Sequence, residues 1–468
     1  MITWDYEIWN VLIQISVLAI LLLIGNTIRR KVKFLRNLLL PTAIIGGFLA
    51  LGLKYIIYAI FGDGVFIQND VMGAIAYHCI ALGFIALTLK ETEKLIDKNK
   101  QIKSVKSGLL IVSTYALQGL LGMGLTMLMS YTFFPDLFQA SGLLLMLGYG
   151  QGPGQAGNIG TSFENQGFIG GNAFGLSIAS IGIIWACVGG VIYMNILRKR
   201  NKLSESIVKN MDYDLTQETY MEPNEIPNSE SIDKLSVQFA FILAIYAATY
   251  LLMYGINSLI ESGTFGDFGL NNIRPLVWGF NFIWATLLTM LLKVIIKGLR
   301  KIKIMNRQYT NNYMLNRISG FTFDFMIIAA ICAIDIGKLN QQNLWIPLLV
   351  LCTVGGFVTL FYVKWSCKKL YSGYQLEGFL SMYGMLTGTI SDGMVLLREV
   401  DPQFKTPAAG NLIFGSTTAV AFGAPLLLLI GIATVYPLLL LIIMAAVFGI
   451  MLFAMLFDFG KLKRKKPF

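Results

Sequence analysis

The sequence predicts an all-α polytopic membrane protein, built from two inverted repeats of five spans each and one extra C-terminal span. Three observations support this fold class: an apolar composition, an alternation of basic and non-basic loops, and two glycine-rich interruptions in matching positions of the two halves. Apolar residues make up 55% of the 468 residues and charged residues 13%. Such a composition is typical of membrane proteins and not of soluble enzymes.

Eleven apolar stretches are long enough to cross a bilayer, which takes about 20 residues. They cover residues 9–28, 38–61, 71–90, 107–133, 168–197, 235–256, 275–296, 318–337, 343–363, 408–431 and 434–457. Asp324 and Asp335 fall near the two ends of the eighth stretch. We therefore expect both carboxylates to face the membrane interfaces.

Lysine and arginine gather in every second loop between these stretches. The basic groups lie within residues 29–36, 90–106, 198–200, 297–307, 364–369 and 461–466. Basic loops stay on the cytoplasmic side of a membrane, so we expect the N-terminus outside and the tail inside. The net charge of +11 is spread over these loops, and it does not indicate nucleic-acid binding.

Two stretches interrupt the apolar pattern. In the first, residues 148–161, five of the ten residues from 148 to 157 are glycine and Pro153 lies among them. Such a composition disfavours a continuous helix. The second, residues 381–392, repeats the pattern at one constant offset: Tyr149, Gly150, Gly154 and Asn158 match Tyr383, Gly384, Gly388 and Asp392. We predict re-entrant segments at about 140–165 on the outer side and about 374–400 on the cytoplasmic side.

Five spans on each side of a polar, acidic linker give the two halves opposite orientations. The predicted organisation is a first repeat at 1–200, a cytoplasmic linker at 201–234, a second repeat at 235–431, and an extra span with a basic tail at 432–468. Paired interruptions in two inverted halves are typical of secondary transporters.

Broken helices in a membrane expose backbone N–H groups that attract anions and carbonyl groups that bind small cations. The candidate substrate-binding residues are Gly150, Gln151, Gly152, Gly154, Gln155, Thr387, Gly388, Thr389 and Asp392. The candidate Na+-binding residues are Asn158, Thr161, Asn172, Ser391, Asp392 and Asn411. The alternative is that the glycines only allow close helix packing and that Asp392 is a solvated residue at the mouth of its segment.

Enzyme chemistry has little support in the sequence. The five cysteines are scattered without metal-ligand spacing, and His78 is the only histidine. A histidine in an apolar span is more often a packed core residue than a proton relay. No nucleotide-binding motif occurs, which disfavours a primary pump. We expect no catalytic residues, no organic cofactor and no metal other than Na+ as coupling ion.

The paired interruptions, the inverted five-span halves and the central linker resemble the sodium/glutamate symporter family. The likeness lies in residues 147–164 and 374–402 and, by organisation, in most of the chain. It implies a homodimer in the bacterial inner membrane that takes up L-glutamate with Na+, one domain moving as an elevator against another. It also places the site between residues 150–161 and 384–392. The family's loops carry a Gly-Gly-His-Gly-Thr-like core, whereas the first interruption here has no histidine.

Other functions remain as alternatives. An H+-coupled carrier or an exchanger of another organic anion would need the same broken helices. Re-entrant segments also form selectivity filters, so an ion channel or anion pore is a second alternative. A membrane enzyme or assembly protein has the least support.

Overall fold

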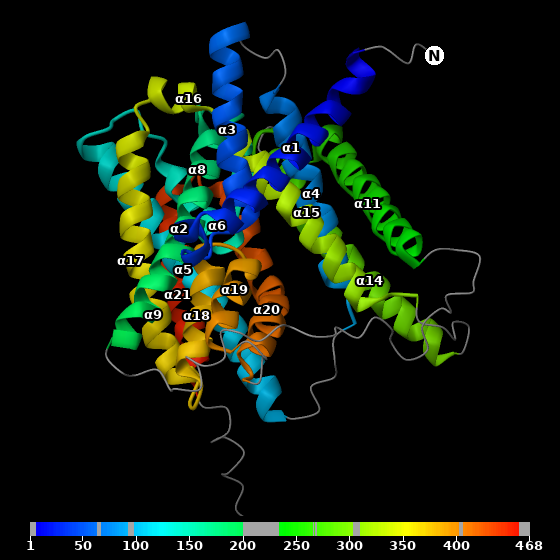
Figure 1. Ribbon diagram of the computed structural model, residues 1–468, viewed down its shortest axis with the longest axis vertical. Helices are drawn as coiled ribbons and strands as arrows, with labels where there is room; N and C mark the ends of the chain where they lie inside the picture. Colours follow the sequence, from blue (N-terminus) through cyan, green and yellow to red (C-terminus); the bar gives the residue numbers. More distant parts are fainter. Residues whose placement is uncertain are drawn as a thin grey trace, which may run out of the picture. The chain divides into compact units, whose positions relative to one another are not determined.

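The computed structural model describes residues 6–62, 67–91, 98–199, 234–264, 266, 269–302, 309–401 and 406–457. Within these ranges the chain forms helices and no strands (Figure 1). The predicted linker lies outside the described residues except for Lys234, and so does the basic tail. The fold class is therefore all-α.

Ten helices of the described part are long and apolar enough to cross a membrane. They coincide with ten of the eleven predicted spans. The remaining prediction, 408–431, coincides with α20 (Ala408–Leu428), a helix of 21 residues that contains Pro425. Hydropathy thus locates the long helices, and the chain is a membrane protein by helix length and composition.

The chain folds into two compact units, and each unit takes segments from both halves of the sequence. Unit 1 consists of Met1–Lys94, Pro153–Leu176 and Asp214–Gln342. Unit 2 consists of Leu95–Gly152, Ser177–Tyr213 and Asn343–Phe468. The compact units therefore do not coincide with the sequence repeats, and the chain passes from unit 2 to unit 1 at the bond between Gly152 and Pro153.

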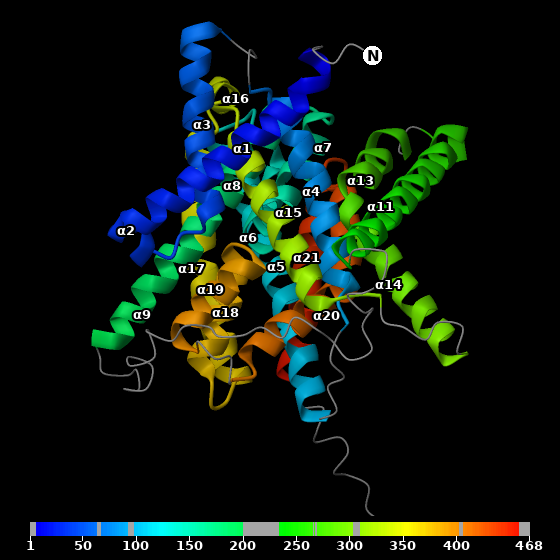
Figure 2. The same cartoon turned by 45° about the vertical axis from the view of Figure 1, so that its right-hand side comes forward.

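The described helices of unit 1 are α1 (Tyr6–Lys31), α2 (Lys33–Asn37), α3 (Thr42–Phe61), α4 (Asn69–Leu89), α7 (Pro153–Glu164), α11 (Lys234–Leu259), η4 (Ile260–Thr264), η5 (Gly269–Ile273), α13 (Arg274–Gly279), α14 (Asn281–Lys301), α15 (Asn312–Cys332) and α16 (Ile336–Gln341). Its core is the pair α4 and α15, which lie side by side in both views (Figures 1 and 2). Gly83 of α4 faces Phe323 of α15 closely enough that a Cβ atom would lie 2.6 Å from the ring.

The described helices of unit 2 are α5 (Lys98–Thr132), η1 (Gln139–Leu143), α6 (Leu144–Gln151), η2 (Trp185–Gly189), α9 (Gly190–Lys199), α17 (Trp345–Leu370), α18 (Gln375–Thr387), α19 (Ile390–Val400), α20, η6 (Leu429–Ile432) and α21 (Pro437–Leu456). Helix α8 (Gly171–Ile184) begins in unit 1 and ends in unit 2. The long helix α5 forms the centre of unit 2, where it packs against α20, α21, α17, α6 and η1.

Candidate functional site: two helix interruptions

The first interruption is a single residue, Gly152, between α6 and α7. Its φ of 94° lies in the left-handed region that favours glycine, and its N–H donates to the carbonyl oxygen of Leu147 at 2.9 Å. Pro153 then starts α7 at the first helical position, where its missing N–H costs nothing. The helix therefore breaks within the predicted stretch, but over one residue, because the glycines that follow are helical.

Those later glycines of α7 serve close packing inside unit 1. A Cβ atom at Gly157 would lie 2.8 Å from Leu176 of α8, and one at Gly160 would collide with the backbone of Gly171. Gly154 faces Ile80 of α4 at a comparable closeness. Close helix packing therefore explains the glycines at these three positions. Small residues commonly let helices approach one another in membrane proteins.

The second interruption, at Gly388 and Thr389, turns the chain between α18 and α19. Thr389 is the N-cap of α19 and forms a capping box with Asp392: the backbone N–H and the hydroxyl of Thr389 donate to Asp392 Oδ2 at 2.8 and 2.7 Å. The Asp392 N–H donates to Thr389 Oγ1 at 3.3 Å. Asp392 is 2% exposed, so its carboxylate caps a buried helix start and is not a solvated residue.

Helices α18 and α19 form a tight helical hairpin in unit 2 (Figure 2). A Cβ atom at Gly384 would lie 2.8 Å from the Cα atom of Gly393, and one at Gly393 would collide with the carbonyl oxygen of Ser381. Glycine at these positions lets the two helices touch through their backbones. Whether this hairpin enters and leaves a bilayer on the same side stays a prediction.

The two interruptions lie next to each other in unit 2. A Cβ atom at Gly152 would lie 3.3 Å from Thr389 Cγ2 and 3.9 Å from the carbonyl oxygen of Gly388. Gly182 of α8 adjoins both segments, because a Cβ atom there would lie 2.5 Å from the Thr387 carbonyl oxygen and 2.7 Å from the Tyr149 ring. Residues from three distant parts of the sequence therefore meet at the breaks.

Two residues of α5 belong to this site although the sequence did not single them out. Gln118, 1% exposed, donates from Nε2 to the Leu386 carbonyl oxygen at 2.8 Å and to Thr359 Oγ1 at 3.0 Å. Its Oε1 has no hydrogen-bond partner. The Tyr115 hydroxyl donates to the carbonyl oxygen of Gly150 at 2.8 Å. Tyr115 and Gln118 therefore fix the ends of α6 and α18. The only sequence feature that indicates this role is a single glutamine in an apolar span.

The matched tyrosines of the two sequence motifs make equivalent contacts. The Tyr149 hydroxyl donates to the Cys352 carbonyl oxygen at 2.6 Å, and the Tyr383 hydroxyl donates to the Trp185 carbonyl oxygen at 3.1 Å. Each tyrosine is buried and each bond joins one half of the sequence to the other. The breaks themselves are out of register with the motif, since Gly152 and Gly388 are 236 residues apart whereas the motif offset is 234.

On the unit 1 side of the first break, Gln155 lies in the first turn of α7. Its side chain is 1% exposed, and neither its Oε1 nor its Nε2 has a hydrogen-bond partner. Gln151, at the end of α6 in unit 2, also has an unpartnered buried Nε2. A buried amide without partners costs free energy, so the Gln155 side chain is a candidate for contact with a bound ligand.

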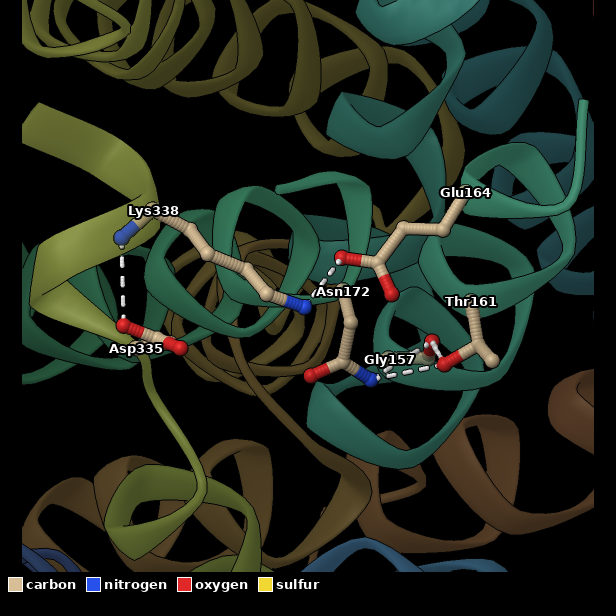
Figure 3. A network of polar contacts seen from close by, with 6 residues as sticks. All are labelled: Gly157, Thr161, Glu164, Asn172, Asp335 and Lys338. Carbon is tan, nitrogen blue, oxygen red and sulfur yellow. Dashed lines mark hydrogen bonds and ion pairs between the residues drawn. The ribbon is translucent and has the colours of Figure 1, made fainter. Parts of the chain in front are cut away.

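Three of the predicted ion-binding residues gather around α7. Asn172 Nδ2 lies 3.1 Å from the Gly157 carbonyl oxygen and 2.8 Å from Thr161 Oγ1 (Figure 3). Asn158 Nδ2 lies 3.2 Å from the Gly279 carbonyl oxygen. The Asn172 amide therefore bridges two oxygens, of Gly157 and Thr161, that lie one helical turn apart on α7.

A charged pair lies beside this group. Lys338 Nζ of α16 is 3.5 Å from Glu164 Oε1 at the end of α7, and the Lys338 N–H donates to Asp335 Oδ1 at 3.1 Å (Figure 3). Asp335 thus caps α16 and lies beyond α15. Because the Lys338 and Glu164 side chains are 45% and 22% exposed, this ion pair contributes little to stability.

The remaining predicted residues lie apart from the breaks or have local partners. Thr387 is fully buried and donates from Oγ1 to the Tyr383 carbonyl oxygen at 2.7 Å. Ser391 is exposed on α19. Asn411 donates to the Tyr374 hydroxyl at 2.8 Å, at the opposite end of α18 from Gly388, about 20 Å away along the helix.

The chain matches no family model, no curated protein and no solved structure in comparisons with known proteins.

Proposed function

We propose that this protein is a Na+-coupled secondary carrier that takes up L-glutamate or a similar small carboxylate. The observation that supports this best is the adjacency of the two helix interruptions in unit 2. Broken helices that meet are the arrangement by which carriers bind a charged substrate and its coupling ion. As part of this proposal, the protein is a homodimer in a bacterial inner membrane, working by an elevator-type movement of compact units.

The substrate carboxylate is assigned to the N-terminus of α7. At the N-terminus of α19 the capping box engages the N–H groups of Thr389 and Asp392 and places a carboxylate there, which disfavours a second anion. In α7 the first N–H groups lack intrahelical partners and carry partial positive charge. Gln155 adds an unpartnered buried amide to the same turn, and its Nε2 can donate to the carboxylate.

The coupling cation is assigned to the next turn of the same helix. The Gly157 carbonyl oxygen and Thr161 Oγ1 both face the Asn172 amide. The two ends of an amide have nearly the same shape, so rotating this side chain by half a turn directs Oδ1 at the same place. Three oxygens then converge, which suits a small hard cation.

Uptake into proteoliposomes tests the proposal. We expect saturable uptake of radiolabelled L-glutamate that an inward Na+ gradient drives, with counterflow of preloaded substrate. Uptake that follows a pH gradient and ignores Na+ would favour the H+-coupled alternative. A current that does not saturate with substrate would favour a channel, which the re-entrant interpretation also permits.

Substitutions test the assignment of the site. Gln155→Ala should raise the substrate concentration for half-maximal uptake about tenfold, which corresponds to about 1.4 kcal/mol, the size of one hydrogen bond to a charged group. Asn172→Ala should weaken the Na+ dependence in the same assay, because the Asn172 amide supplies one of the three assigned oxygens. Gln341→Ala is the matched control, because this glutamine is exposed at the end of α16. Wild-type kinetics in both site variants would show that the site lies elsewhere.

A further inference from the structure

Helix α15 has exposed polar residues within a membrane span. Asn316, Arg317, Gly320 and Asp324 are exposed, and Phe321 beside them is 55% exposed. Residues 317, 320 and 324 follow one another at spacings of three and four residues, which places them on one side of the helix. From Phe325 onward the residues are buried through Ile334, so the exposed face ends at Asp324.

The depth of Asp324 differs from the prediction that it faces a membrane interface. Helix α15 begins at Asn312, earlier than the predicted span, and ends at Cys332. Asp324 is therefore twelve residues from the start of the helix, or about 18 Å along its axis. A bilayer's hydrocarbon core is about 30 Å thick, which places this carboxylate near mid-depth.

Asp324 has no hydrogen bond or ion pair with another of the described residues. A carboxylate in hydrocarbon is costly, so intramembrane acids face a protein interior or a water-filled cavity. The space beside it is open, since a Cβ atom at Gly320 would have nothing within 4 Å. Helix α14, in the same unit, shows what a lipid-facing surface is made of: Leu287, Leu291, Val294 and Ile295 are exposed and apolar, and exposed lysines come only toward its end, at Lys297 and Lys301.

We propose that the exposed face of α15 lines a water-filled path from one membrane surface to mid-depth, and that Asp324 makes this path attractive to small monovalent cations. Water explains how the unpaired carboxylate, Asn316 and Arg317 are tolerated on a spanning helix. The carboxylate stands at the inner end of the polar face, where it attracts cations and repels anions. This inference needs no assumption about the transported substrate.

Thiol labelling tests the aqueous path. The five native cysteines are first replaced by alanine. Proteoliposomes that carry Gly320→Cys or Asn316→Cys are then treated with a positively charged, membrane-impermeant methanethiosulfonate. Both should react roughly tenfold faster than Leu291→Cys on α14, because thiolates react in water and not in lipid. Leu291 is the matched control, being 56% exposed on an apolar face. Equal, slow labelling at all three positions would overturn the proposal and indicate that lipid or a second protein chain covers α15.

A second comparison tests the role of Asp324 without any transport assay. At pH 8.5 the rate of labelling at Gly320→Cys is measured with a cationic and with an anionic methanethiosulfonate. One helical turn separates the two positions, about 6 Å, so removing the carboxylate in Asp324→Asn should lower the cation-to-anion rate ratio about tenfold. Asp324→Glu should keep the ratio. An unchanged ratio in Asp324→Asn would overturn the cation preference, even if the labelling itself shows water.

If the proposed transport is observed, Asp324→Asn should also lower Na+-driven uptake. That measurement rests on the proposed function, whereas the two labelling measurements do not. A wild-type protein that transports nothing but labels as expected would leave the water path intact and remove the carrier proposal. The opposite pattern, normal transport with an unlabelled α15, would remove only the water path.

Discussion

Asp392 combines a capping role with a negative charge, and a conservative substitution separates the two. In Asp392→Asn the amide oxygen can still accept the hydrogen bonds that the Thr389 N–H and hydroxyl now give to Oδ2. We therefore expect the melting temperature in detergent to change by less than about 2 °C, while Na+-driven uptake falls strongly if the carboxylate, a ligand predicted from the sequence, also binds the coupling ion. Asp392→Ala is the comparison, since loss of the cap should cost about 1 kcal/mol of stability.

If Asp392→Asn transports like the wild type, the carboxylate serves only the start of α19. If both variants unfold, the cap depends on the charge itself, through its favourable interaction with the start of the helix.

Lys54 shows how a buried charge can stabilise unit 1. Its side chain is 8% exposed, and Nζ donates to the carbonyl oxygens of Cys332 and Ile334 at 2.6 and 2.8 Å and to Asn69 Oδ1 at 3.0 Å. These carbonyls lie at the end of α15, where the helix has no further N–H donors. Lys54→Met should leave them unsatisfied and destabilise the protein by about 1–3 kcal/mol.

A thermal melt in detergent measures this loss, with Lys31→Met as control, because Lys31 is exposed in the last turn of α1. A drop of several degrees is expected for Lys54→Met and almost none for the control. Equal melting temperatures would mean that water replaces the ammonium group at these carbonyls.

At the level of elements, α5 offers a matched pair of glycines. Gly122 contacts Gly142 of η1 so closely that a Cβ atom on either would collide with the other's backbone, whereas a Cβ atom at Gly124 would meet nothing within 4 Å. We expect Gly122→Ala to force α5 and η1 apart and to cost about 1–3 kcal/mol. Gly124→Ala should be neutral or slightly stabilising, since alanine favours helix. The yield and melting temperature of the two purified variants distinguish these outcomes, and equal behaviour would show that η1 can move away freely.

The helices and their breaks could be predicted to different degrees. Long apolar stretches identify spanning helices because about 20 residues are needed to cross a bilayer, and a Gly-Pro pair disfavours the continuation of a helix. The exact ends could not be predicted: α15 starts at Asn312, six residues before the expected position. Both breaks lie within the predicted segments, and capping by Thr389 determines where α19 begins.

The contacts at the breaks were not predictable from the sequence. Gln118 and Tyr115 are single polar residues in an apolar span, and many such residues only bond their own helix. Their partners, Leu386 and Gly150, become neighbours only through long-range packing. The same holds for the division into units, since α7 packs with α4 and α15 although it follows α6 directly in the chain.

At the level of the whole molecule, the orientation in the membrane is the prediction on which the inverted arrangement depends. Helix α17 has no basic residue at its start and has Lys368 and Lys369 in its last turn. Its 26 residues extend about 39 Å, enough to cross a bilayer. The positive-inside rule then places Gln342 outside and Ser372 inside, and both residues are exposed.

Single thiols at these two positions test the orientation in intact cells. An impermeant reagent should label Gln342→Cys at once and Ser372→Cys only after the membrane is permeabilised, in a background without native cysteines. The reverse labelling pattern would mean that the chain has the opposite orientation in the membrane, with the basic loops outside. Labelling of both from outside would show that α17 does not span, and the hairpin of α18 and α19 would then approach from the same side as α16. In that case two inverted halves could not form, and the adjacency of Gly152 and Thr389 would need another explanation.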